Sequence, residues 1–538
     1  MNTLDLDKKK SDSLYRIGLV FAIGLFLFTH LYKLDSILDM WNTDEVGLIL
    51  NVQSLAKYGT DRYGNSFPMY PINYIGEQSP LFTYLYLIVY KIFGYSKFSI
   101  RMVTVVFSMI ATVYWVRIYY LLGENKRRNT LMMLFAMAGF PTVVLLMRLG
   151  LDCNLMFTLT PVFFYYFLKA LYSEKNKDYV IAGIAAGIIL YSYILSHLIM
   201  PFFLLLIFIY LLRIRKIRVS NIIAFMIPVI LLAIPLIPFH IVNTFRLEPF
   251  SVFGISYVST PDNRTSEISA LQIPFNLLIN LIPLLGFDAQ PYATISYFGT
   301  VYWISVPFFL LGLINGTKQT ADSFKKKEFN MTSLVTIWFY TIYLSNSMIL
   351  GKAYRFNPIF FSIIYLTIEG ICEFIKHVSV SVKKRKIVSI AIALCYTIFF
   401  IGFVIFYFGG AYTRNYVSGS TDKYCAYDMK NALIRVEEIR SEIGDRDLYV
   451  GNLCYVHAHY QLALNIDPKE FYLDENGNVR ADHEDVYRND HFYLVSDPWD
   501  TDMYMVDEGN MDYCHMLMDK GFTYEYVDHY YIFYKIDV

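Results

Sequence analysis

Long apolar runs separated by short polar segments occupy the chain from about residue 16 to residue 408. A helix that crosses the roughly 30 Å hydrocarbon core of a bilayer needs about 20 such residues. The runs therefore predict eleven membrane-spanning helices, at residues 16–34, 99–122, 130–147, 153–172, 179–195, 198–212, 221–241, 301–315, 332–349, 355–376 and 387–408. Three lysines at positions 8–10 and Arg16 precede the first run, and no small-x-small cleavage site follows it. We expect an uncleaved anchor rather than a signal peptide.

One apolar and aromatic segment, residues 80–93, is shorter than a span requires. If it crossed the membrane, the basic loop at residues 126–128 would lie outside and every later loop would reverse its side. The segment is rich in Tyr and Phe, as helices at a membrane interface are. We therefore predict a helix that lies in the outer interface.

The pattern changes after residue 408. Long apolar runs stop, and Asp and Glu occur throughout residues 409–538. Residues 447–452 and 491–496 have the pattern of short strands, residues 428–443 that of an amphipathic helix, and residues 525–537 that of a closing strand or hairpin. The fold class predicted is a multi-pass α-helical membrane protein with a C-terminal α/β domain outside the membrane.

Charge divides the chain at the same place. Residues 1–408 contain 35 Lys and Arg against 21 Asp and Glu, and residues 409–538 contain 11 against 25, so the formal net charge is zero. Only 17% of residues are charged, against about 25% in soluble domains, which argues against a soluble enzyme. A pI near 7.1 gives no sign of the basic face that nucleic acid requires.

The basic loops specify the orientation in the membrane. In the predicted topology all of them lie on one side, as the positive-inside rule demands; they are residues 126–128, 175–177, 213–218, 325–327 and 383–386. Residues 1–15 are then cytosolic. Three regions face outward: the loops 35–98 and 242–300, and the tail 409–538.

The spacing of the cysteines and histidines indicates neither a disulfide-stabilised fold nor a metal site. Of the six cysteines, Cys425, Cys454 and Cys514 lie in the tail. Two of these three could form one disulfide, and the sequence does not specify which two. No zinc-type spacing occurs. His457 and His459 would need further ligands that the sequence does not supply.

Ionisable residues gather at the outer ends of the predicted spans, and the span interiors are nearly free of them. The outer group is Asp44, Glu45, Glu77, Arg148, Asp152, His197, His240, Lys352 and Arg355. A pump would need polar groups in mid-membrane. This distribution favours a reaction between a lipid-borne group and a partner outside. A carboxylate there can accept a proton from a hydroxyl, and Arg, Lys or a metal ion can balance a phosphate.

Five short motifs resemble those of GT-C-fold glycosyltransferases, such as protein O-mannosyltransferases and the lipid A aminoarabinose transferase. Residues 41–45 (Trp-Asn-Thr-Asp-Glu) look like the Asp-Glu motif that follows their first span. The others, in the same order as in that family, are residues 76–84, 93–101, 148–152 and 354–358. The resemblance covers about residues 15–410, which would form the catalytic membrane domain (16–408).

The resemblance implies an inverting enzyme of a bacterial plasma membrane that moves a sugar from a polyprenyl-phosphate carrier to a cell-envelope acceptor: a wall polymer, a glycolipid or a protein. Asp44 would be the general base or the carboxylate that positions the acceptor, and Glu45 would be catalytic together with it. Arg148 and Arg355 would hold the phosphate. The remaining substrate-binding residues would be Glu77, Gln78, Asp152, His197 and Tyr354. A divalent ion, Mg²⁺ or Mn²⁺, would bind to Asp44 and Asp152 if one is used.

Position 78 departs from the family pattern. The family has Lys after the Glu and then Pro, whereas this chain has Gln78 and Ser79. Gln cannot neutralise a phosphate, so donor binding would depend more on arginine or a metal ion. Two alternatives stay open: a transporter or flippase of lipid-linked sugars, and a non-catalytic membrane scaffold that works through its exported domain.

Overall fold

The structure is a computed structural model of the whole chain, and it forms two compact units that are described separately. Unit 1 comprises Met1–Leu34, Arg101–Pro238 and Arg264–Ile405, and unit 2 comprises Asp35–Ile100, Phe239–Asn263 and Phe406–Val538. The residues that the structure describes are 3–74, 76–123, 125–261, 268–287, 293–378, 381–414, 424–444, 446–451, 453–473, 488–489, 492–493 and 501–536.

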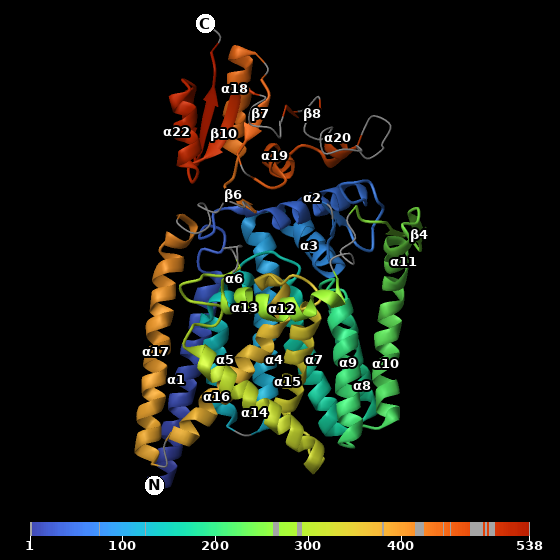
Figure 1. The fold of residues 1–538 in the computed structure, drawn as a ribbon, viewed down its shortest axis with the longest axis vertical. Helices are drawn as coiled ribbons and strands as arrows, with labels where there is room; N and C mark the ends of the chain where they lie inside the picture. Colours follow the sequence, from blue (N-terminus) through green and yellow to red (C-terminus); the bar gives the residue numbers. More distant parts are fainter. Residues whose placement is uncertain are drawn as a thin grey trace. The chain divides into compact units, whose positions relative to one another are not determined.

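Unit 1 is helical, and its long helices run side by side (Figure 1). In chain order they are α1 (Thr3–Leu31), α4 (Lys97–Leu122), α5 (Lys126–Gly139), α6 (Pro141–Met147), α7 (Asn154–Ser173), α8 (Asn176–Ile189), α9 (Ser196–Arg213), α10 (Val219–Ala233), α12 (Ile273–Ile279), α13 (Leu281–Leu285), α14 (Ser305–Lys326), α15 (Met331–Asn346), the 3₁₀ segment η4 (Ala353–Ile359), α16 (Phe360–Val378) and α17 (Val382–Phe408).

Among the described residues, seven helices are long and apolar enough to cross a membrane: Asp12–Leu31, Lys97–Leu122, Asn154–Ser173, Ser196–Arg213, Val219–Phe245, Ala353–Val378 and Val382–Phe408. The pair α5 and α6, bent by 60°, would make an eighth. Helices also stand at the other three predicted spans, where α8 and α15 are short, with 14 and 16 residues, and α14 ends in a charged half. The predicted number of eleven crossings therefore stays a prediction.

Two glycines allow α14 and α16 to approach each other closely in unit 1. A Cβ on Gly312 of α14 would lie 1.9 Å from the Leu366 carbonyl oxygen of α16, and one on Gly370 of α16 would lie 1.9 Å from the Phe308 carbonyl oxygen of α14. The two backbones therefore touch directly, which is how small residues stabilise helix pairs where lipid offers no hydrophobic driving force.

Unit 2 contains Asp35–Ile100, which includes the loop predicted to face outward, together with the tail. Its elements are β1 (Trp41–Asn42), α2 (Thr43–Tyr58), β2 (Ile72–Asn73), β3 (Gly76–Glu77), α3 (Pro80–Phe93), α11 (Ile237–Phe245), β4 (Phe250–Val252), β5 (Ile255–Tyr257), β6 (Cys425–Ala426), α18 (Lys430–Ile443), β7 (Leu448–Val450), α19 (Val456–Leu464), α20 (Pro468–Tyr472), β8 (Arg488–Asn489), β9 (Phe492–Tyr493), β10 (Met503–Asp507), α22 (Met511–Asp519), β11 (Thr523–Val527) and β12 (Tyr530–Tyr534). Helix α3 coincides with the short helix predicted at residues 80–93.

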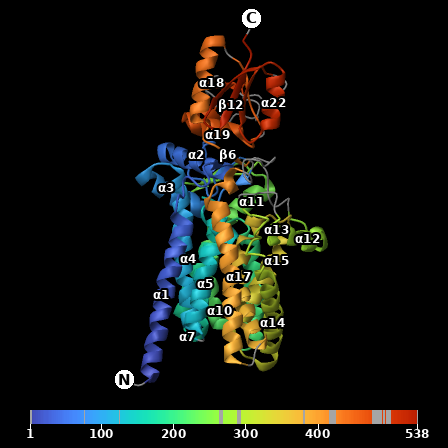
Figure 2. The ribbon, with the colours of Figure 1, turned by 90° about the vertical axis from the view of Figure 1, so that its left-hand side faces the viewer.

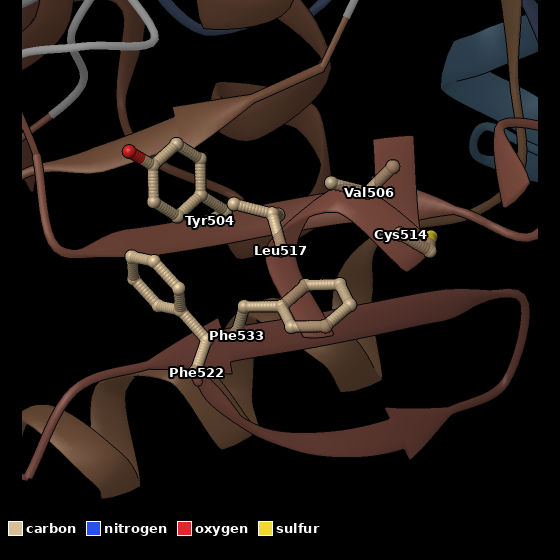
Figure 3. Close-up of a cluster of buried hydrophobic side chains, with 6 residues drawn as sticks. All are labelled: Tyr504, Val506, Cys514, Leu517, Phe522 and Phe533. Atoms are coloured by element: carbon tan, nitrogen blue, oxygen red, sulfur yellow. The ribbon is translucent and has the colours of Figure 1, made fainter. Parts of the chain in front are cut away.

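The tail forms the predicted α/β domain. A four-stranded sheet has the order β11-β12-β10-β7, in which β7 and β10 are parallel and the other pairs antiparallel. Figure 2 shows this sheet between α18 and α22. On the α22 side, a buried cluster fixes the packing (Figure 3): Tyr504, Val506, Cys514, Leu517, Phe522 and Phe533. The predicted helix, first strand and closing hairpin are confirmed; of the strand predicted at 491–496, only β9 lies within the described residues.

All six cysteines are free thiols in the structure, so the disulfide left open among Cys425, Cys454 and Cys514 is not formed. Cys514 belongs to the apolar cluster of the sheet instead, which is the ordinary setting of a buried free cysteine.

Candidate active site

The Asp-Glu pair lies in the first turn of α2, where its two side chains have different surroundings. Asp44 is exposed, whereas Glu45 is completely buried. Asn42 Oδ1 accepts a hydrogen bond from the Asp44 amide at 2.9 Å, and Glu45 Oε2 accepts one from the Asn42 amide at 3.3 Å. These bonds form a capping box. Glu45 thus caps the helix, and its predicted catalytic role stays a prediction; Asp44 is the exposed carboxylate, at the positive end of the helix dipole.

The residue before Asp44 is held at each of its polar groups. The Thr43 amide donates to the Tyr424 carbonyl at 2.8 Å. The Thr43 hydroxyl lies 3.1 Å from the same carbonyl and 3.2 Å from His459 Nε2. The Thr43 carbonyl accepts a bond from the Tyr74 hydroxyl at 2.7 Å. Beside it, β1 pairs with β6, so the tail contacts the Asp-Glu motif directly.

Tyr74 and Tyr455 form a second contact between the tail and the segment around Thr43. Their rings are stacked at 4.0 Å between centroids, and both residues have left-handed backbones, with φ of 58° and 55°. Residues with a Cβ seldom adopt that conformation, and it persists where surrounding contacts impose it. Burial raises the pKa of the Tyr74 phenol well above its ordinary value, so the phenol keeps the proton that it donates to Thr43.

Glu77 and Gln78 lie at the end of the β2–β3 pair, in which Ile72 is opposite Glu77. Glu77 is half-buried and Gln78 is buried. Gln78 Oε1 accepts a bond from Asn51 Nδ2 at 3.2 Å, and Asn51 Nδ2 also donates to the Ile72 carbonyl at 2.9 Å. Gln78 therefore fixes the strand pair to α2. A lysine has no acceptor and could not make this bond, which gives the departure at position 78 a structural reason.

Arg62 is a buried cation in unit 2 that the sequence analysis did not single out. It is 1% exposed, and its guanidinium carbon lies 4.5 Å from the Tyr74 ring centroid, 5.1 Å from that of Tyr63 and 5.2 Å from that of Tyr472. Arg62 Nη2 donates to Asn73 Oδ1 at 3.2 Å. Cation–π contacts of this kind stabilise a desolvated guanidinium. Since Tyr472 belongs to α20, Arg62 is a further contact between the tail and residues 35–100.

An open cavity of about 910 Å³ lies in unit 2, along the second half of α2. Carboxylates, amides, Lys57 and two tyrosines line it: Gln53, Ala56, Lys57, Tyr90, Glu437, Tyr460, Leu464, Asn465, Ile466, Asp467, Pro468 and Glu470. Lys57 and Tyr58 both donate to the Asp467 carboxylate at its edge.

Arg148 lies at the end of α6 in unit 1, and it is buried. Its guanidinium donates to three carbonyl groups at the end of α1, those of Thr29 at 3.0 Å and of Tyr32 and Lys33 at 2.9 Å each. These are the carbonyls that a helix leaves without internal partners. The observed contacts of Arg148 are those of a helix cap, and its predicted phosphate-binding role stays a prediction.

Two predicted site segments come together in unit 1 through a pair of asparagines. Asn154, two residues after the half-buried Asp152, accepts a bond at Oδ1 from Asn357 Nδ2 at 2.5 Å. Asn357 belongs to η4, which also carries the half-buried Tyr354 and Arg355. Arg355 Nη1 donates to the Leu350 carbonyl at 3.2 Å.

His197 is placed at the start of α9, where it is half-buried. Its Nε2 lies 2.8 Å from the Leu190 carbonyl. Because a carbonyl can only accept, Nε2 carries the proton and the bond fixes the orientation of the ring.

No group of three or more His, Cys, Asp or Glu that could hold a metal ion occurs in the part of the chain that the structure describes. Asp44 and Asp152 have the oxygen ligands that Mg²⁺ or Mn²⁺ takes, and such ions often bind one or two carboxylates plus a substrate phosphate. A divalent ion at these residues remains a prediction.

Solved structures share this architecture. The structure of ArnT from Cupriavidus metallidurans in the apo state aligns with a TM-score of 0.54 and 10% sequence identity, over 97% of this chain and 98% of that one. The same protein bound to undecaprenyl phosphate aligns with a TM-score of 0.52, also at 10% identity and with the same coverage. This chain has a GT-C fold. The archaeal oligosaccharyltransferase AglB from Archaeoglobus fulgidus aligns with a TM-score of 0.47 at 12% identity, over 94% of this chain and 71% of that one.

A family comparison agrees with the GT-C fold over part of the chain. Residues 77–241 match the family described as dolichyl-phosphate-mannose-protein mannosyltransferase. This stretch begins at Glu77 and includes Arg148, Asp152 and His197. A comparison with curated proteins finds no match.

Proposed function

We propose that this GT-C-fold protein is an inverting glycosyltransferase of the plasma membrane. It moves a sugar from a polyprenyl-phosphate carrier to a cell-envelope acceptor on the outer face, with the N-terminus in the cytosol and the tail outside. The observation that carries the proposal is the exposed Asp44 carboxylate on a rigidly held helix start, within the fold of a transferase whose structure contains undecaprenyl phosphate. The match to a mannosyltransferase family supports it.

Asp44 is the general base of the proposed reaction. It takes the proton of an acceptor hydroxyl as that oxygen attacks the anomeric carbon of the sugar. The bond between this carbon and the phosphate oxygen breaks, and polyprenyl phosphate leaves with the electron pair. Attack from the face opposite the phosphate inverts the anomeric centre.

The phosphate needs a cation to balance the charge that develops on it. Arg355 is the stronger choice, because it is half-buried and so partly open to a substrate, whereas Arg148 is buried and its guanidinium donates to three carbonyls. Glu77, Asp152, His197 and Tyr354 would orient the substrates. Gln78 acts indirectly, by fixing the strand pair that carries Glu77. A divalent ion at Asp44 and Asp152 would assist the phosphate if one is used.

The test uses purified protein in nanodiscs with an undecaprenyl-phosphate-linked sugar and a cell-envelope fraction, and it follows release of undecaprenyl phosphate. Asp44→Asn should lower turnover by roughly 10²- to 10⁴-fold, the usual contribution of a general base. Asp35→Asn is the control, because Asp35 is also exposed and lies in the same outer loop. Unchanged turnover in Asp44→Asn would remove Asp44 from the mechanism.

Glu45→Gln separates the two members of the pair. Glutamine also closes a capping box, so this variant should keep most of its turnover if Glu45 only caps α2. A loss as large as that of Asp44→Asn would give Glu45 a catalytic role. Titration with undecaprenyl phosphate distinguishes a scaffold, which should not bind the lipid.

A further inference from the structure

The tail reaches the residue next to the proposed base. Thr43 and His459 lie 416 positions apart in the sequence, yet His459 Nε2 is 3.2 Å from Thr43 Oγ1. Thr43 is also bound through its amide to Tyr424 and through its carbonyl to Tyr74. Since the amide, the hydroxyl and the carbonyl of Thr43 are all hydrogen-bonded, Thr43 fixes the orientation of the backbone at Asp44.

The direction of the His459 hydrogen bond follows from a count of protons. Thr43 Oγ1 has one proton, and it donates that proton to the Tyr424 carbonyl at 3.1 Å. When that proton lies on the Tyr424 carbonyl, His459 is the donor to Oγ1, with its own proton on Nε2. Burial lowers the pKa of His459 to about 3, so the ring is neutral at ordinary pH.

His459 is unsuited to act on a substrate itself. It is 3% exposed, and the cavity that it lines holds only about 40 Å³, too little for a sugar or a polymer acceptor. A neutral ring whose proton on Nε2 is already used in a bond to Thr43 also cannot serve as a base through that nitrogen. Its effect on the reaction must pass through Thr43.

We propose that His459 is a positioning residue, which holds Thr43 and thereby orients the Asp44 carboxylate. In this way the acidic tail contributes a residue to the site around Asp44. This inference rests on the proposed function, in which Asp44 is the base. It gives the tail a direct part in turnover, through a contact that does not involve the acceptor.

The experiment compares conservative and disruptive changes at both ends of the bond. His459→Phe and Thr43→Val remove the donor and the hydroxyl at nearly constant size, whereas His459→Gln and Thr43→Ser keep a donor and a hydroxyl. His515→Phe is the matched control, because His515 is an exposed histidine of α22 in the same domain. Turnover and the KM for the lipid-linked sugar are measured for each, with hydrogen exchange of the peptide that contains Thr43 and Asp44.

We expect His459→Phe and Thr43→Val each to lower kcat by about 10- to 100-fold, as a misplaced reactive group does, with KM within about 2-fold. The double variant should be no worse than either single one, because both remove one bond. His459→Gln and Thr43→Ser should recover most of kcat. Exchange at the Thr43 peptide should accelerate only in the disruptive variants.

Three results would overturn the inference: unchanged kcat in His459→Phe, equal losses in the Phe and Gln variants, or unchanged hydrogen exchange in His459→Phe. The failure of the proposed function is a separate result. If Asp44→Asn is inactive while His459→Phe has normal turnover, Asp44 is supported as the base and the positioning role of His459 is refuted. If no protein, wild type included, transfers sugar, the proposed function falls, and accelerated exchange in His459→Phe alone still supports the hold on Thr43.

Discussion

Replacing Gln78 with the lysine of the resembled family should damage this protein rather than improve it. Gln78 and Asn51 are both buried, at 4% and 0% exposure. Asn51 Nδ2 uses its two protons on the Ile72 carbonyl and Gln78 Oε1. The expected loss of stability depends on what each substitution at position 78 leaves opposite the Asn51 amide.

Gln78→Met removes the side-chain amide and with it the acceptor. A buried N–H of Asn51 then lacks its partner, at a cost of about 1–3 kcal/mol. For a folded unit of 150–250 residues, each kcal/mol corresponds to roughly 2–4 °C in the thermal midpoint. Gln78→Lys has the same loss and adds an ammonium group, whose burial without a counter-charge costs several kcal/mol more. Its midpoint should therefore fall further than that of Gln78→Met.

The assay is thermal unfolding of the purified protein in detergent, followed by a thiol-reactive dye. Gln53→Met and Gln53→Lys are the controls, because Gln53 is half-buried on the same helix and lines the open cavity. Changes there should stay within about 0.5 kcal/mol. A Gln78→Lys variant that is as stable as the wild type and transfers sugar faster would refute the structural role of the Gln78–Asn51 hydrogen bond. It would instead indicate that the residue at position 78 binds the phosphate.

Two further predictions concern stability. The pKa of His459 is about 3 in the folded protein, against about 6.5 when exposed, so between these pH values the unfolded chain binds a proton that the folded chain does not. The stabilisation from this difference is complete above about pH 6.5 and is lost as the pH falls, at up to about 1.4 kcal/mol per pH unit. The thermal midpoint should drop from pH 7.5 to 5, and less in His459→Gln; an equal drop in both would contradict the assignment. In unit 1, Gly312→Ala should destabilise the protein by about 1–3 kcal/mol or more, because the new Cβ would meet the Leu366 carbonyl at 1.9 Å. Gly24→Ala in α1, where no atom lies within 4 Å of the new Cβ, should keep or slightly raise the midpoint, since Ala favours a helix over Gly; a similar decrease in both variants would argue against the direct contact of α14 with α16.

Much of the fold was predictable because its signals are local. The short helix at residues 80–93 begins at a proline in the first turn and ends before Gly94, as its sequence indicates. The α/β tail follows from alternating strands and one amphipathic helix. The long spans follow from the length of apolar sequence, whereas the identity of the shorter helices α8 and α15 as crossings does not.

The site was predictable as a set of residues but not as a set of roles. Motif spacing singled out Asp44, Glu45, Arg148, Asp152 and Arg355, yet Glu45 caps α2 and Arg148 caps α1. In the sequence, His459 is a candidate only for metal binding, together with His457. Its contact with Thr43 spans 416 positions, and no local periodicity indicates a bond of that kind.

By itself, the sequence determined the division into an apolar body and an acidic α/β tail, since bilayer thickness and helix geometry require continuous apolar length. It also determined the order of the motifs, on which the family resemblance depends. Only the tertiary structure decided which polar groups meet. Gln78 with Asn51, Asn357 with Asn154, and His459 with Thr43 are pairs of residues distant in sequence. Because a buried hydrogen bond depends on atoms within about 3 Å of each other, the role of each residue was fixed only when the chain folded and brought its partner to it.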